Sequence, residues 1–378
     1  MIYILVNTIL LLYVVLLTIW IFNVLTTKHI VTGDYQNELT VTVIIPARNE
    51  SSNIDICLAS LLKLDCDPAR VEFIVADDHS EDDTIKKCGD WIGKFADKNF
   101  RFIVSEAEEQ ESEGKKNALN RAIKIAQGDV IITSDADCTF ESGWIHKHIE
   151  QYYDSEVNMV CGPVIIAPTK KFLDYFQSIE QSVLTAISIG ALHMGYPLMC
   201  NGANLSFRKT TFDEIGGYSY GIALPGGDDV FLMLSMNRSY PGSIKYLSSL
   251  QSKVTTSAET GFNSYIDQRL RHGSKVKTYE EWHVKLIGGL LLSSNIIVFL
   301  SGILFVAQWI PANYLFWIFV AKFGMDAVFG IIALFKFKQY NLLVYILPVT
   351  ILYPLISTFI GISIIFKKNY TWKGRLFK

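Results

Sequence analysis

Two closely spaced acids follow an apolar stretch, where they could bind a cation. Asp135 and Asp137 come directly after the run 130–133, and residues i and i+2 of an extended segment project to the same side. Two carboxylates placed in this way could hold a hard divalent ion, with its other positions open to phosphate oxygens. Aspartate is also common in solvated turns, so the spacing alone is a weak signal.

A second acidic pair could take part in proton transfer. Asp228 and Asp229 follow two glycines at the start of an apolar helix. One of the two can cap that helix. The other could then act as a general base, provided that it reaches an incoming hydroxyl. Taken alone, the pattern indicates no more than a capping motif.

A third acidic pair suits a nucleoside. Asp77 and Asp78 end another apolar run, and a carboxylate there can accept hydrogen bonds from a base edge or a ribose hydroxyl. The alternative is that this segment only caps the next helix, with Ser80 as the capping residue before an acidic first turn. The two roles are compatible, with Ser80 capping and the aspartates binding.

Two basic segments suit phosphate groups. Lys115 and Lys116 open a helix after Gly114, and lysine is unfavourable at a helix N-terminus unless an anion binds there. Gln268 and Arg271, spaced i and i+3, would share one helical face and could bind a diphosphate. The alternatives are a solvated lysine pair at the first segment and a patch touching anionic lipid headgroups at the second.

The elements that must position these residues alternate between strands and helices. Strands are predicted over 41–46, 71–75, 101–104 and 130–133, with helices over 51–62, 81–91 and 115–126. This alternation predicts a mostly parallel sheet, in which ligands bind beyond the carboxyl ends of the strands. Three polar clusters fall at those ends, over 46–50, 77–80 and 134–137. We therefore expect them to lie close together.

The composition indicates a membrane protein with a soluble domain inside it. Of 378 residues, 50% are hydrophobic and only 19% are charged, against ~25% in an average soluble chain, and the mean hydropathy is +0.27. A net charge of -3 argues against nucleic acid as a partner. The six cysteines form no CxxC pair, so a zinc site or a disulfide framework is not expected.

Four apolar stretches exceed the ~20 residues that are needed to cross a bilayer. They cover about 2–25, 286–309, 312–335 and 342–366. The first has no basic leader and no cleavage site, so we interpret it as a retained anchor rather than a signal peptide. Lys28, Lys275, Lys277, Lys285, Lys336 and Lys338 flank the first three stretches. The excess of lysine on cytoplasmic loops therefore predicts a multi-pass protein of the cell (inner) membrane with its soluble domain in the cytoplasm.

The last apolar stretch conflicts with that simple topology. Lysines precede it at 336 and 338 and follow it at 367 and 368, so a single crossing would export one basic cluster. With Pro348 and Pro354 inside, it could instead be a broken, re-entrant or hairpin segment, and the sequence leaves both alternatives open. Lys322 and Asp326, at i and i+4 in the third stretch, are interpreted as a mutually satisfied pair rather than a relay.

Seven segments together resemble the membrane-bound family 2 glycosyltransferases that have a GT-A catalytic domain. In order they are VIIPARNE, VADDHSEDDT, GKKNALNRA, SDADC, NGANLSFRK, GGDDVFL and QRLRHGSK, and the resemblance covers about 40–280 with the surrounding spans. It implies an α/β, Rossmann-like GT-A domain in the cytoplasm with transmembrane helices at both ends. The implied domains are an anchor over 1–27, the GT-A domain over 40–282, transmembrane or re-entrant helices over 283–367, and a basic tail over 368–378.

The resemblance also implies roles for individual residues. The nucleoside of a nucleotide-sugar would be held by Pro46, Ala47, Arg48, Asn49 and Glu50 with Asp77 or Asp78, and Lys115 or Lys116 would lie near the nucleotide. Asp135 and Asp137 would bind the pyrophosphate through Mg²⁺ or Mn²⁺, with Asp137 preferred as the direct ligand. Asp229 would be the catalytic base, and Asp228 is the second choice.

The remaining implied roles concern the acceptor. Asn201, Gly202, Ala203 and Asn204 would line its side of the site. Gln268 and Arg271 match the fixed positions of the family's Q-x-x-R-W element, which contacts the diphosphate and the acceptor end, whereas Arg269 occupies a variable position. His272 stands where the family has tryptophan, on the acceptor side, which weakens an inference of processive polymer synthesis.

Three functional hypotheses follow. The first is an inverting, metal-dependent transfer from a nucleotide-sugar, by family default a UDP-sugar, to a lipid or lipid-linked acceptor at the cytoplasmic membrane face. The second is a processive polysaccharide synthase with the same chemistry and a glycan acceptor, against which stand His272 and the small number of spans. The third is a catalytically decayed scaffold that binds nucleotide. The long stretch 172–199 could be a surface that leads an acceptor to the site, or it could be core packing.

Overall fold

The computed structural model describes residues 2–27, 39–107, 113–220 and 226–366, with the backbone of two short strands at 370–372 and 375–377. Lys28 and most of the basic tail over 368–378 lie outside the described residues. The chain divides into two compact units. One comprises residues 28–165 and 199–257, and is called here the sheet unit. The other comprises residues 1–27, 166–198 and 258–378, and is called the helical unit.

The sheet unit is built on seven strands in the order β3-β2-β1-β4-β8-β6-β9. The four predicted strands are present, each matching or slightly exceeding its predicted length, and they run parallel to one another. β8 then pairs antiparallel with both β4 and β6. The strands are β1 (Val41–Ala47), β2 (Val71–Asp77), β3 (Arg101–Ser105), β4 (Val130–Thr133), β6 (Met159–Cys161), β8 (Leu205–Arg208) and β9 (Ile244–Tyr246).

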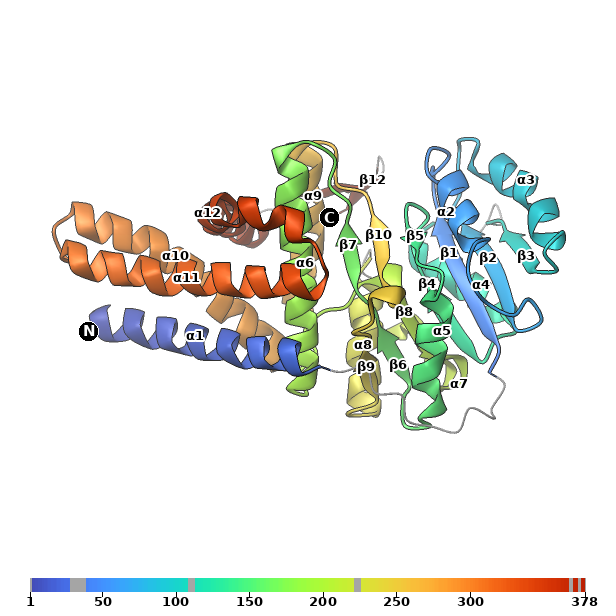
Figure 1. Ribbon diagram of the computed structural model, residues 1–378, viewed down its shortest axis with the longest axis horizontal. Helices are drawn as coiled ribbons and strands as arrows, with labels where there is room; N and C mark the ends of the chain where they lie inside the picture. The colour runs from blue at the N-terminus through green and yellow to red at the C-terminus, as the bar shows by residue number, and fades with distance from the viewer. Residues whose placement is uncertain are drawn as a thin grey trace. The chain divides into compact units, whose positions relative to one another are not determined.

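Helices pack against this sheet because its central strands are apolar on both faces. Every residue of β1, β2 and β4 is buried, as expected for parallel strands covered by helices. Val43, Ile45 and Phe73 share a core cluster with Ile54 and Leu58. The helices are α2 (Ile54–Leu61), α3 (Thr84–Ala96), α4 (Lys115–Ile125), α5 (Trp144–Ile149), α7 (Lys209–Glu214) and α8 (Asp228–Ser239). Figure 1 shows α2, α3 and α4 beside these strands.

Short elements complete the sheet unit. A second sheet has the order β5-β10-β7, with β5 (Thr139–Phe140), β10 (Val254–Thr256) and β7 (Val164–Ile166). Single turns of 3-10 helix are η1 (Glu150–Tyr153), η2 (Gly202–Asn204), η3 (Gly217–Ser219) and η4 (Leu250–Ser252). This mixed α/β architecture agrees with the predicted fold class.

The helical unit contains the four predicted apolar stretches. Four of the described helices are long and apolar enough to cross a membrane, over Ile2–Thr26, Trp282–Val306, Ala312–Lys336 and Tyr340–Ile364, which indicates a membrane protein. The unit consists of α1 (Ile2–Thr26), α6 (Phe172–His193), α9 (Phe262–Ser274), η5 (Lys275–Lys277), α10 (Trp282–Val306), α11 (Ala312–Lys336), η6 (Tyr340–Tyr345), α12 (Ile346–Phe366), β11 (Tyr370–Trp372) and β12 (Arg375–Phe377).

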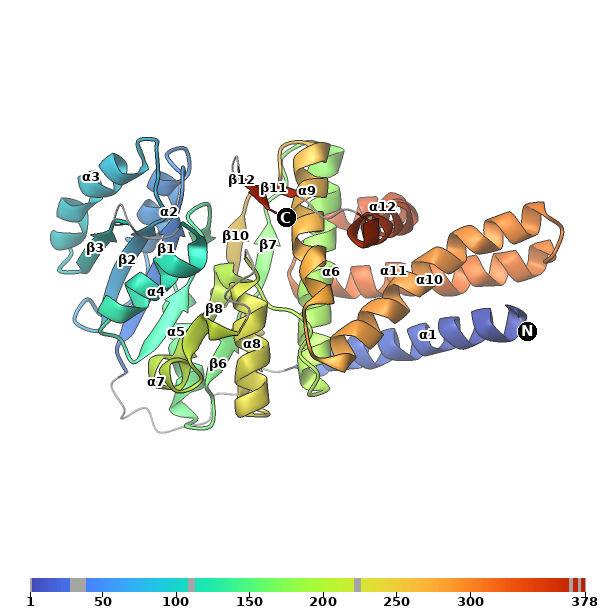
Figure 2. The same ribbon diagram turned by 180° about the vertical axis from the view of Figure 1, so that it is seen from behind.

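Within this unit, α1, α10 and α11 lie side by side, and α6 and α9 run across their ends (Figure 2). Most of α6 is buried against α1 and α11, so its apolar residues serve as core rather than as an exposed acceptor surface. A methyl group at Gly190 of α6 would lie 2.7 Å from Cγ of Trp20. The close approach of the two helices therefore requires glycine at this position.

The intramembrane charges are paired, as predicted. Lys322 Nζ donates to Asp326 Oδ2 at 2.5 Å and to the hydroxyl of Tyr13 at 3.1 Å, and Tyr13 in turn donates to Asp326. Both charged groups lie inside the helical unit, where each has a partner. The arrangement joins α1 to α11.

Candidate active site

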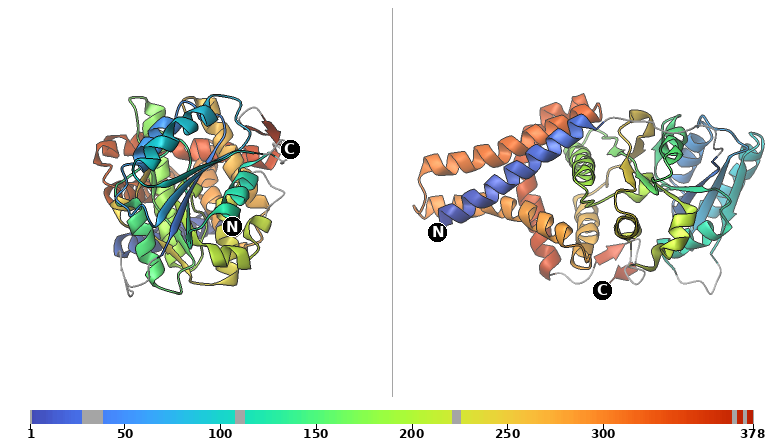
Figure 3. Two further views of the ribbon diagram at one scale, coloured as in Figure 1. Left: turned by 90° about the vertical axis from the view of Figure 1, so that its right-hand side faces the viewer. Right: turned by 90° about the horizontal axis from the view of Figure 1, so that it is seen from below.

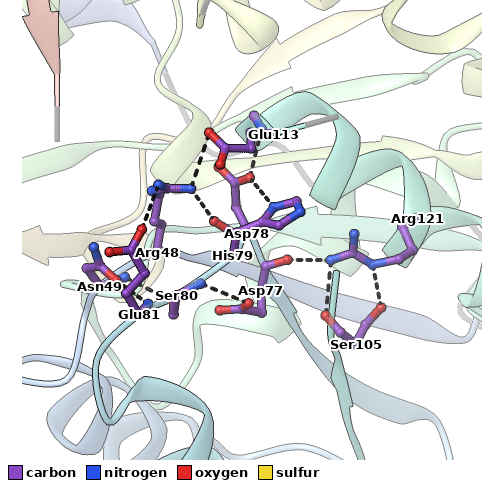
Figure 4. A network of polar contacts seen from close by, with 11 residues as sticks. Arg48, Asn49, Asp77, Asp78, His79, Ser80, Glu81, Ser105, Glu113 and Arg121 are labelled. Carbon is purple, nitrogen blue, oxygen red and sulfur yellow. Dashed lines mark hydrogen bonds and ion pairs between the residues drawn. The ribbon is translucent and has the colours of Figure 1, made fainter. Parts of the chain in front are cut away.

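The segments that follow β1 and β2 are held together by reciprocal hydrogen bonds. The two strands end in register, with Ala47 opposite Asp77. Beyond them the Asn49 backbone N–H donates to Ser80 Oγ at 3.0 Å, and the Glu81 N–H donates to Asn49 Oδ1 at 2.8 Å. Asn49 has a φ of 51°, a left-handed conformation that asparagine tolerates better than most residues. Figure 4 shows these contacts beyond the ends of β1 and β2.

Arg48 lies in the middle of this polar network. Its side chain is 8% exposed, and Nη1 donates to the carbonyl oxygen of Asp78 at 2.8 Å. Glu81 and Glu113 lie on either side of the guanidinium, at 3.8 and 3.9 Å (Figure 4). A largely buried guanidinium thus lies between two exposed acids.

The two aspartates at the end of β2 have different partners. Asp77 Oδ2 accepts the N–H of Ser80 at 3.1 Å. The prediction that Ser80 caps the next helix is wrong, because α3 begins at Thr84 after Asp83, and Ser80 Oγ instead accepts the Asn49 N–H. Asp77 Oδ1 is buried and has no hydrogen-bond partner among the described residues. Asp78 Oδ1 accepts the N–H of Gly114 at 2.7 Å, which joins β2 to the start of α4. Asp77 therefore keeps one acceptor that a ligand could use.

Arg121 is a member of the network that sequence reasoning missed. Its Nη2 donates to the carbonyl oxygens of Asp77 and Ser105, and its Nε donates to Ser105 Oγ at 3.0 Å (Figure 4). It lies on α4, about one and a half turns after the two lysines. Only the packing of α4 on β2 reveals this role, because nothing in the sequence distinguishes Arg121 from a solvated helix residue.

The other residues predicted after β1 have structural contacts. Pro46 and Ala47 are buried within β1 itself. The Glu50 backbone N–H donates to Thr84 Oγ1 at 2.8 Å, and its carboxylate accepts from Asn53 Nδ2 at 2.9 Å. The segment therefore forms a rigid loop whose most polar buried side chain is Arg48.

The predicted cation-binding pair lies beside a lysine. Lys115 Nζ donates to Asp135 Oδ1 at 2.6 Å, which joins the start of α4 to the end of β4. Asp137 Oδ2 accepts from Thr256 Oγ1 at 3.0 Å, a contact with β10 that the sequence did not indicate. Burial raises the pKa of Asp137, and the neighbouring charges of Asp135 and Glu50 raise it further.

The proposed base belongs to the same cluster as this pair. Burial acts to lower the pKa of Lys115, but the fields of Asp135, then Asp228 and Asp229, raise it above its ordinary value overall. Acids separated by about ninety residues thus act on one ammonium group. Among the sequence-predicted residues, the structure brings together Lys115, Asp135, Asp228 and Asp229.

Lys116 points into the interior of the unit. Its side chain is 7% exposed, and Nζ lies 5.3 Å from the centre of the Phe231 ring. Burial lowers its pKa, against the opposing effects of Asp228 and Asp229. Of the two lysines, Lys115 is therefore the better placed to meet a phosphate at the end of β4.

The segment 201–204 connects the two acidic pairs. Thr133 Oγ1 donates to the Gly202 carbonyl at 2.9 Å, and Ser134 Oγ donates to the Ala203 carbonyl at 2.7 Å. The Gly202 N–H in turn donates to Asp229 Oδ2 at 2.9 Å. Asn201 Oδ1 caps the following turn by accepting the Ala203 N–H at 3.0 Å. The hydrogen bonds of this short segment thus link the end of β4 to the start of α8 in space.

The side-chain amide of Asn204 forms hydrogen bonds with buried groups of the protein. The side chain is fully buried, and Nδ2 donates to the carbonyls of Pro163 and Ser252 at 2.9 and 2.8 Å. Oδ1 accepts from Trp144 Nε1 at 2.9 Å and contacts His148 Nε2 at 2.8 Å. An acceptor would consequently meet Asn201 or the backbone of this segment rather than the Asn204 amide.

The residues present fit a divalent cation bound together with a phosphate ligand. The charge of Asp135 helps to raise the pKa of Asp137, and a cation would relieve that repulsion. The described residues contain no group of three or more histidines, cysteines and acids that could hold a metal. An ion at this pair would therefore take its remaining ligands from water and from phosphate oxygens, as hard divalent cations do.

The predicted diphosphate element lies on α9, in the helical unit. Gln268 Nε2 donates to Glu259 Oε1 at 3.0 Å, and Arg269 Nη2 pairs with Glu180 Oε2 at 2.8 Å. Arg269 is largely buried, whereas Arg271 is partly exposed and His272 is exposed. The guanidinium of Arg269 thus binds α6, and the ligand contacts predicted for Gln268, Arg271 and His272 stay predictions.

Residues 42–216 match the sequence model described as Glycosyl transferase family 2. The Probable glycosyltransferase YdaM of Bacillus subtilis is 29% identical over 182 residues, which are 47% of this chain and 42% of that protein. The Poly-beta-1,6-N-acetyl-D-glucosamine synthase of Staphylococcus aureus is 28% identical over 178 residues, 47% of this chain and 41% of that protein. The alignments therefore span less than half the length of these curated relatives.

The fold has a counterpart among solved structures. The structure of "Mannosyltransferase PcManGT from Pyrobaculum calidifontis in complex with GDP-Man and Mn2+" matches with a TM-score of 0.53 at 17% identity. The match covers 88% of this chain and 95% of that one. At this identity the likeness concerns the fold alone.

Proposed function

This chain belongs to glycosyltransferase family 2 through residues 42–216, and on that premise we propose that it is an inverting, metal-dependent enzyme. It transfers a sugar from a nucleotide-sugar, by family default a UDP-sugar, to a lipid or lipid-linked acceptor at the cytoplasmic membrane face. The single observation that carries the proposal is the link between the two acidic pairs: Gly202 contacts both Asp229 and Thr133, two residues before Asp135.

The nucleoside would bind beyond β1 and β2. The buried Oδ1 of Asp77 is an acceptor without a partner among the described residues, and it suits an N–H of the base or a ribose hydroxyl. Arg48 and Arg121 fix the backbone around Asp77 and Asp78. The site is therefore pre-organised, which reduces the entropy lost when the ligand binds.

The diphosphate would lie beyond β4. Lys115 carries a positive charge there, because three acids maintain its protonated form. A Mg²⁺ or Mn²⁺ ion held by Asp135 and Asp137 would supply further neutralisation of the charge that develops on the leaving group. The structural neighbour in complex with GDP-Man and Mn²⁺ is consistent with this assignment.

The chemistry is a single displacement. Asp229 accepts the proton of the acceptor hydroxyl, and the hydroxyl oxygen attacks the anomeric carbon of the sugar. The bond from that carbon to the diphosphate oxygen breaks, and the nucleoside diphosphate leaves with the bonding electrons. One displacement inverts the configuration at the anomeric carbon. Asp229 can hold its position because Gly202 N–H donates to Oδ2.

The acceptor is proposed from the membrane helices. Four described helices are apolar enough to span a bilayer, and a lipid or lipid-linked acceptor would be confined to the same membrane. The lysines near the ends of the spans favour a cytoplasmic site. Donor nucleotide-sugars are polar, so the enzyme would join a water-soluble donor to a membrane-bound acceptor.

A second candidate is a processive polysaccharide synthase. The observation that favours it is the match to a relative described as a poly-N-acetylglucosamine synthase. His272, which replaces the family's tryptophan, opposes it because imidazole provides a smaller platform for a sugar chain than indole does. The two candidates share their chemistry and differ in their product.

The test uses membranes that contain the full chain, incubated with a panel of radiolabelled nucleotide-sugars. We expect label in an organic-extractable product in the presence of Mg²⁺ or Mn²⁺, and none with Asp229→Ala. High-molecular-mass label formed without added lipid acceptor would favour the second candidate. Label transfer that survives Asp229→Ala would reject Asp229 as the base. The absence of any sugar transfer or nucleotide release would reject the proposed glycosyltransferase activity.

A further inference from the structure

The last apolar helix, α12, is long enough to cross a bilayer. Its 21 residues span ~31 Å at 1.5 Å per residue, close to the ~30 Å hydrocarbon core. Lysines lie before it at 336 and 338 and after it at 367 and 368, so a crossing would place one basic cluster on the wrong face. Length and composition cannot decide between the alternatives, but the contacts at the two ends of the helix can.

The first end of α12 is joined to α6. Gln339, just before the η6 turn that leads into α12, donates from Nε2 to the Ile166 carbonyl at 3.3 Å and to Ser178 Oγ at 3.2 Å. Ile346, the first residue of α12, is buried in a cluster with Phe176 of α6. The helix thus starts in the layer that α6 forms.

The last described turn of α12 returns to the same layer. Lys277 of η5 donates from Nζ to the Ile364 carbonyl at 2.7 Å. A methyl group at Gly273 of α9 would lie 2.2 Å from Cδ1 of Ile364, so the two helices are in direct contact. The lysine also satisfies one of the carbonyls that a helix leaves unpaired at its C-terminus.

That layer lies at one end of the spans. Asn23, near the end of α1, donates to the Gly190 carbonyl of α6 at 2.9 Å, and His283, at the start of α10, contacts the Pro197 carbonyl at 3.0 Å. The other end of the spans is marked by the hydroxyl of Tyr3, which donates to the Trp309 carbonyl at 3.0 Å. Both ends of α12 therefore lie on the α6 side.

The direction of α12 agrees with these contacts. In Figure 1 it is seen nearly end-on, whereas α1, α10 and α11 extend along the picture. The right-hand view of Figure 3 shows α12 running across the spans instead of alongside them. Pro354 lies inside the helix without interrupting it, so the segment is neither a hairpin nor broken.

One face of α12 is apolar and exposed. Its exposed side chains recur every three or four residues, which is the spacing of a single helical face. The buried side chains, including Ile346 and Val349, pack on the opposite face. The large exposed side chains of this face are Leu347, Ile351, Leu355, Phe359 and Ile362, and Val344 of η6 continues the row.

We infer that α12 lies in the plane of the membrane, with this exposed face against lipid hydrocarbon, and does not cross. The occupant is lipid because the face is continuous with α10 and α11, whose apolar residues line a pocket together with Ile351 and Leu355. Both basic clusters then lie on the α6 side, in agreement with the lysine rule. The bilayer partner would thus contact a helix parallel to its surface as well as the spans.

The experiment compares three single-cysteine additions in the full chain: Glu280→Cys on the α9 side, Ala307→Cys between α10 and α11, and Lys378→Cys at the end. Intact and permeabilised cells are treated with a membrane-impermeant maleimide polymer, and gel shifts are compared with the unmodified chain, which has six cysteines. Glu280 and Ala307 are exposed and report opposite faces. Their comparison does not depend on the orientation of the chain or on its activity.

We expect Lys378→Cys and Glu280→Cys to show the same pattern of labelling, either in intact cells or only after permeabilisation. Ala307→Cys should show the opposite pattern. If Lys378→Cys instead reacts together with Ala307→Cys, α12 crosses the membrane and the inference is overturned. A loss of sugar transfer would not affect either result, so the topology and the proposed function fail separately.

Discussion

Gly202 donates its backbone N–H to Oδ2 of Asp229, 27 residues later in the chain, at 2.9 Å. The Gly202 carbonyl accepts from Thr133 Oγ1 at 2.9 Å, and Asp135 lies two residues beyond Thr133. A single glycine therefore joins the proposed base to the strand that carries the proposed cation ligands. The position of the Asp229 carboxylate relative to the end of β4 is thus fixed by two hydrogen bonds to the backbone of one glycine.

The role of Asp229 is tested with Asp229→Asn. Asparagine is nearly isosteric, and its amide oxygen can still accept the Gly202 N–H, while the contact of Asp229 Oδ1 with the Val230 N–H is lost. Because one of the two backbone contacts is kept, the fold should be retained while the base is lost. General-base catalysis contributes about 10²- to 10⁴-fold, so we expect kcat to fall by that factor with little change in the donor KM. Steady-state kinetics on the full chain measures both quantities, and Asp213→Asn, an exposed aspartate, is the matched control. Equal losses in the two variants would contradict the assignment.

The two lysines that open α4 should respond differently to the same change. Lys115→Met removes the ammonium group 2.6 Å from Asp135, so we expect weaker donor binding and a lower kcat, by about tenfold or more for a charge-assisted contact. Lys116 is buried against Phe231, so Lys116→Met keeps most of the packing and should leave the donor KM within about threefold. Donor titrations distinguish the variants, and a larger effect at Lys116 would reverse the assignment.

Much of the site could be predicted because its residues lie at strand ends. The apolar runs of β1, β2 and β4 end directly before Arg48, Asp78 and Asp135, and parallel strands bring such ends together. The resemblance to a known family then indicated Asp229, which no local pattern distinguishes from a capping residue. The strand-end residues and Asp229 could thus be predicted from the order of the motifs along the chain, whereas their closeness in space comes from the fold.

Other features could not be predicted, because they depend on which surfaces pack. Arg121 and Thr256 reach the site from positions with no distinctive neighbours in the sequence. Asn204 is part of a polar motif, yet it binds four groups of the core. The packing partners of α6 were left open, because a buried helix and a membrane-surface helix can both be rich in apolar residues.

Asp137 should make the metal-free protein sensitive to pH. Its pKa is raised in the folded state by burial and by Asp135, so the folded chain binds this proton more tightly than the unfolded chain does. The stabilisation is fully present below the ordinary carboxyl pKa of ~3.9 and is lost as the pH rises through the raised value. With EDTA present, we therefore expect the melting temperature of the unmodified chain to contain a component that falls with rising pH.

The variant Asp137→Asn removes this component. It should melt above the unmodified chain at neutral pH in EDTA, and added Mn²⁺ should raise its melting temperature less. Differential scanning fluorimetry of the full chain in detergent measures both effects, with Asp154→Asn, a partly exposed aspartate of the same unit, as a control. A variant that melts below the unmodified chain in EDTA would show that the carboxylate is stabilising without a cation.

Two glycines near Asn204 and Asp229 should differ in their tolerance of a methyl group. At Gly162 the added carbon would lie 2.4 Å from Cγ of Asn204, whose amide is held on both sides. At Gly202 it would lie 3.4 Å from Cβ of Asp229, which is an ordinary contact. We expect Gly162→Ala to destabilise by about 1–3 kcal/mol or more and Gly202→Ala by much less, measured by thermal unfolding. Equal stability of the two variants would contradict the described packing around Asn204.

The buried pair between α6 and α9 should depend strongly on having both partners. Arg269 Nη2 lies 2.8 Å from Glu180 Oε2, and the Tyr265 hydroxyl donates to the same carboxylate at 3.0 Å. Burial raises the pKa of Glu180, while Arg269 and Tyr265 lower it. Arg269→Met leaves a buried carboxylate without its cation, which typically destabilises by about 3–5 kcal/mol.

The double variant Glu180→Gln with Arg269→Met removes both charges and should recover much of that loss, because the desolvation of an ion pair opposes its attraction. Thermal unfolding of the full chain in lipid nanodiscs provides the four corners of the cycle, which isolates the coupling between the two residues. Additive losses would mean that the pair contributes no coupling. Since Gln268 and Arg271 lie on the same helix as Arg269, a displaced α9 should also raise the donor KM in Arg269→Met if these residues contact the diphosphate.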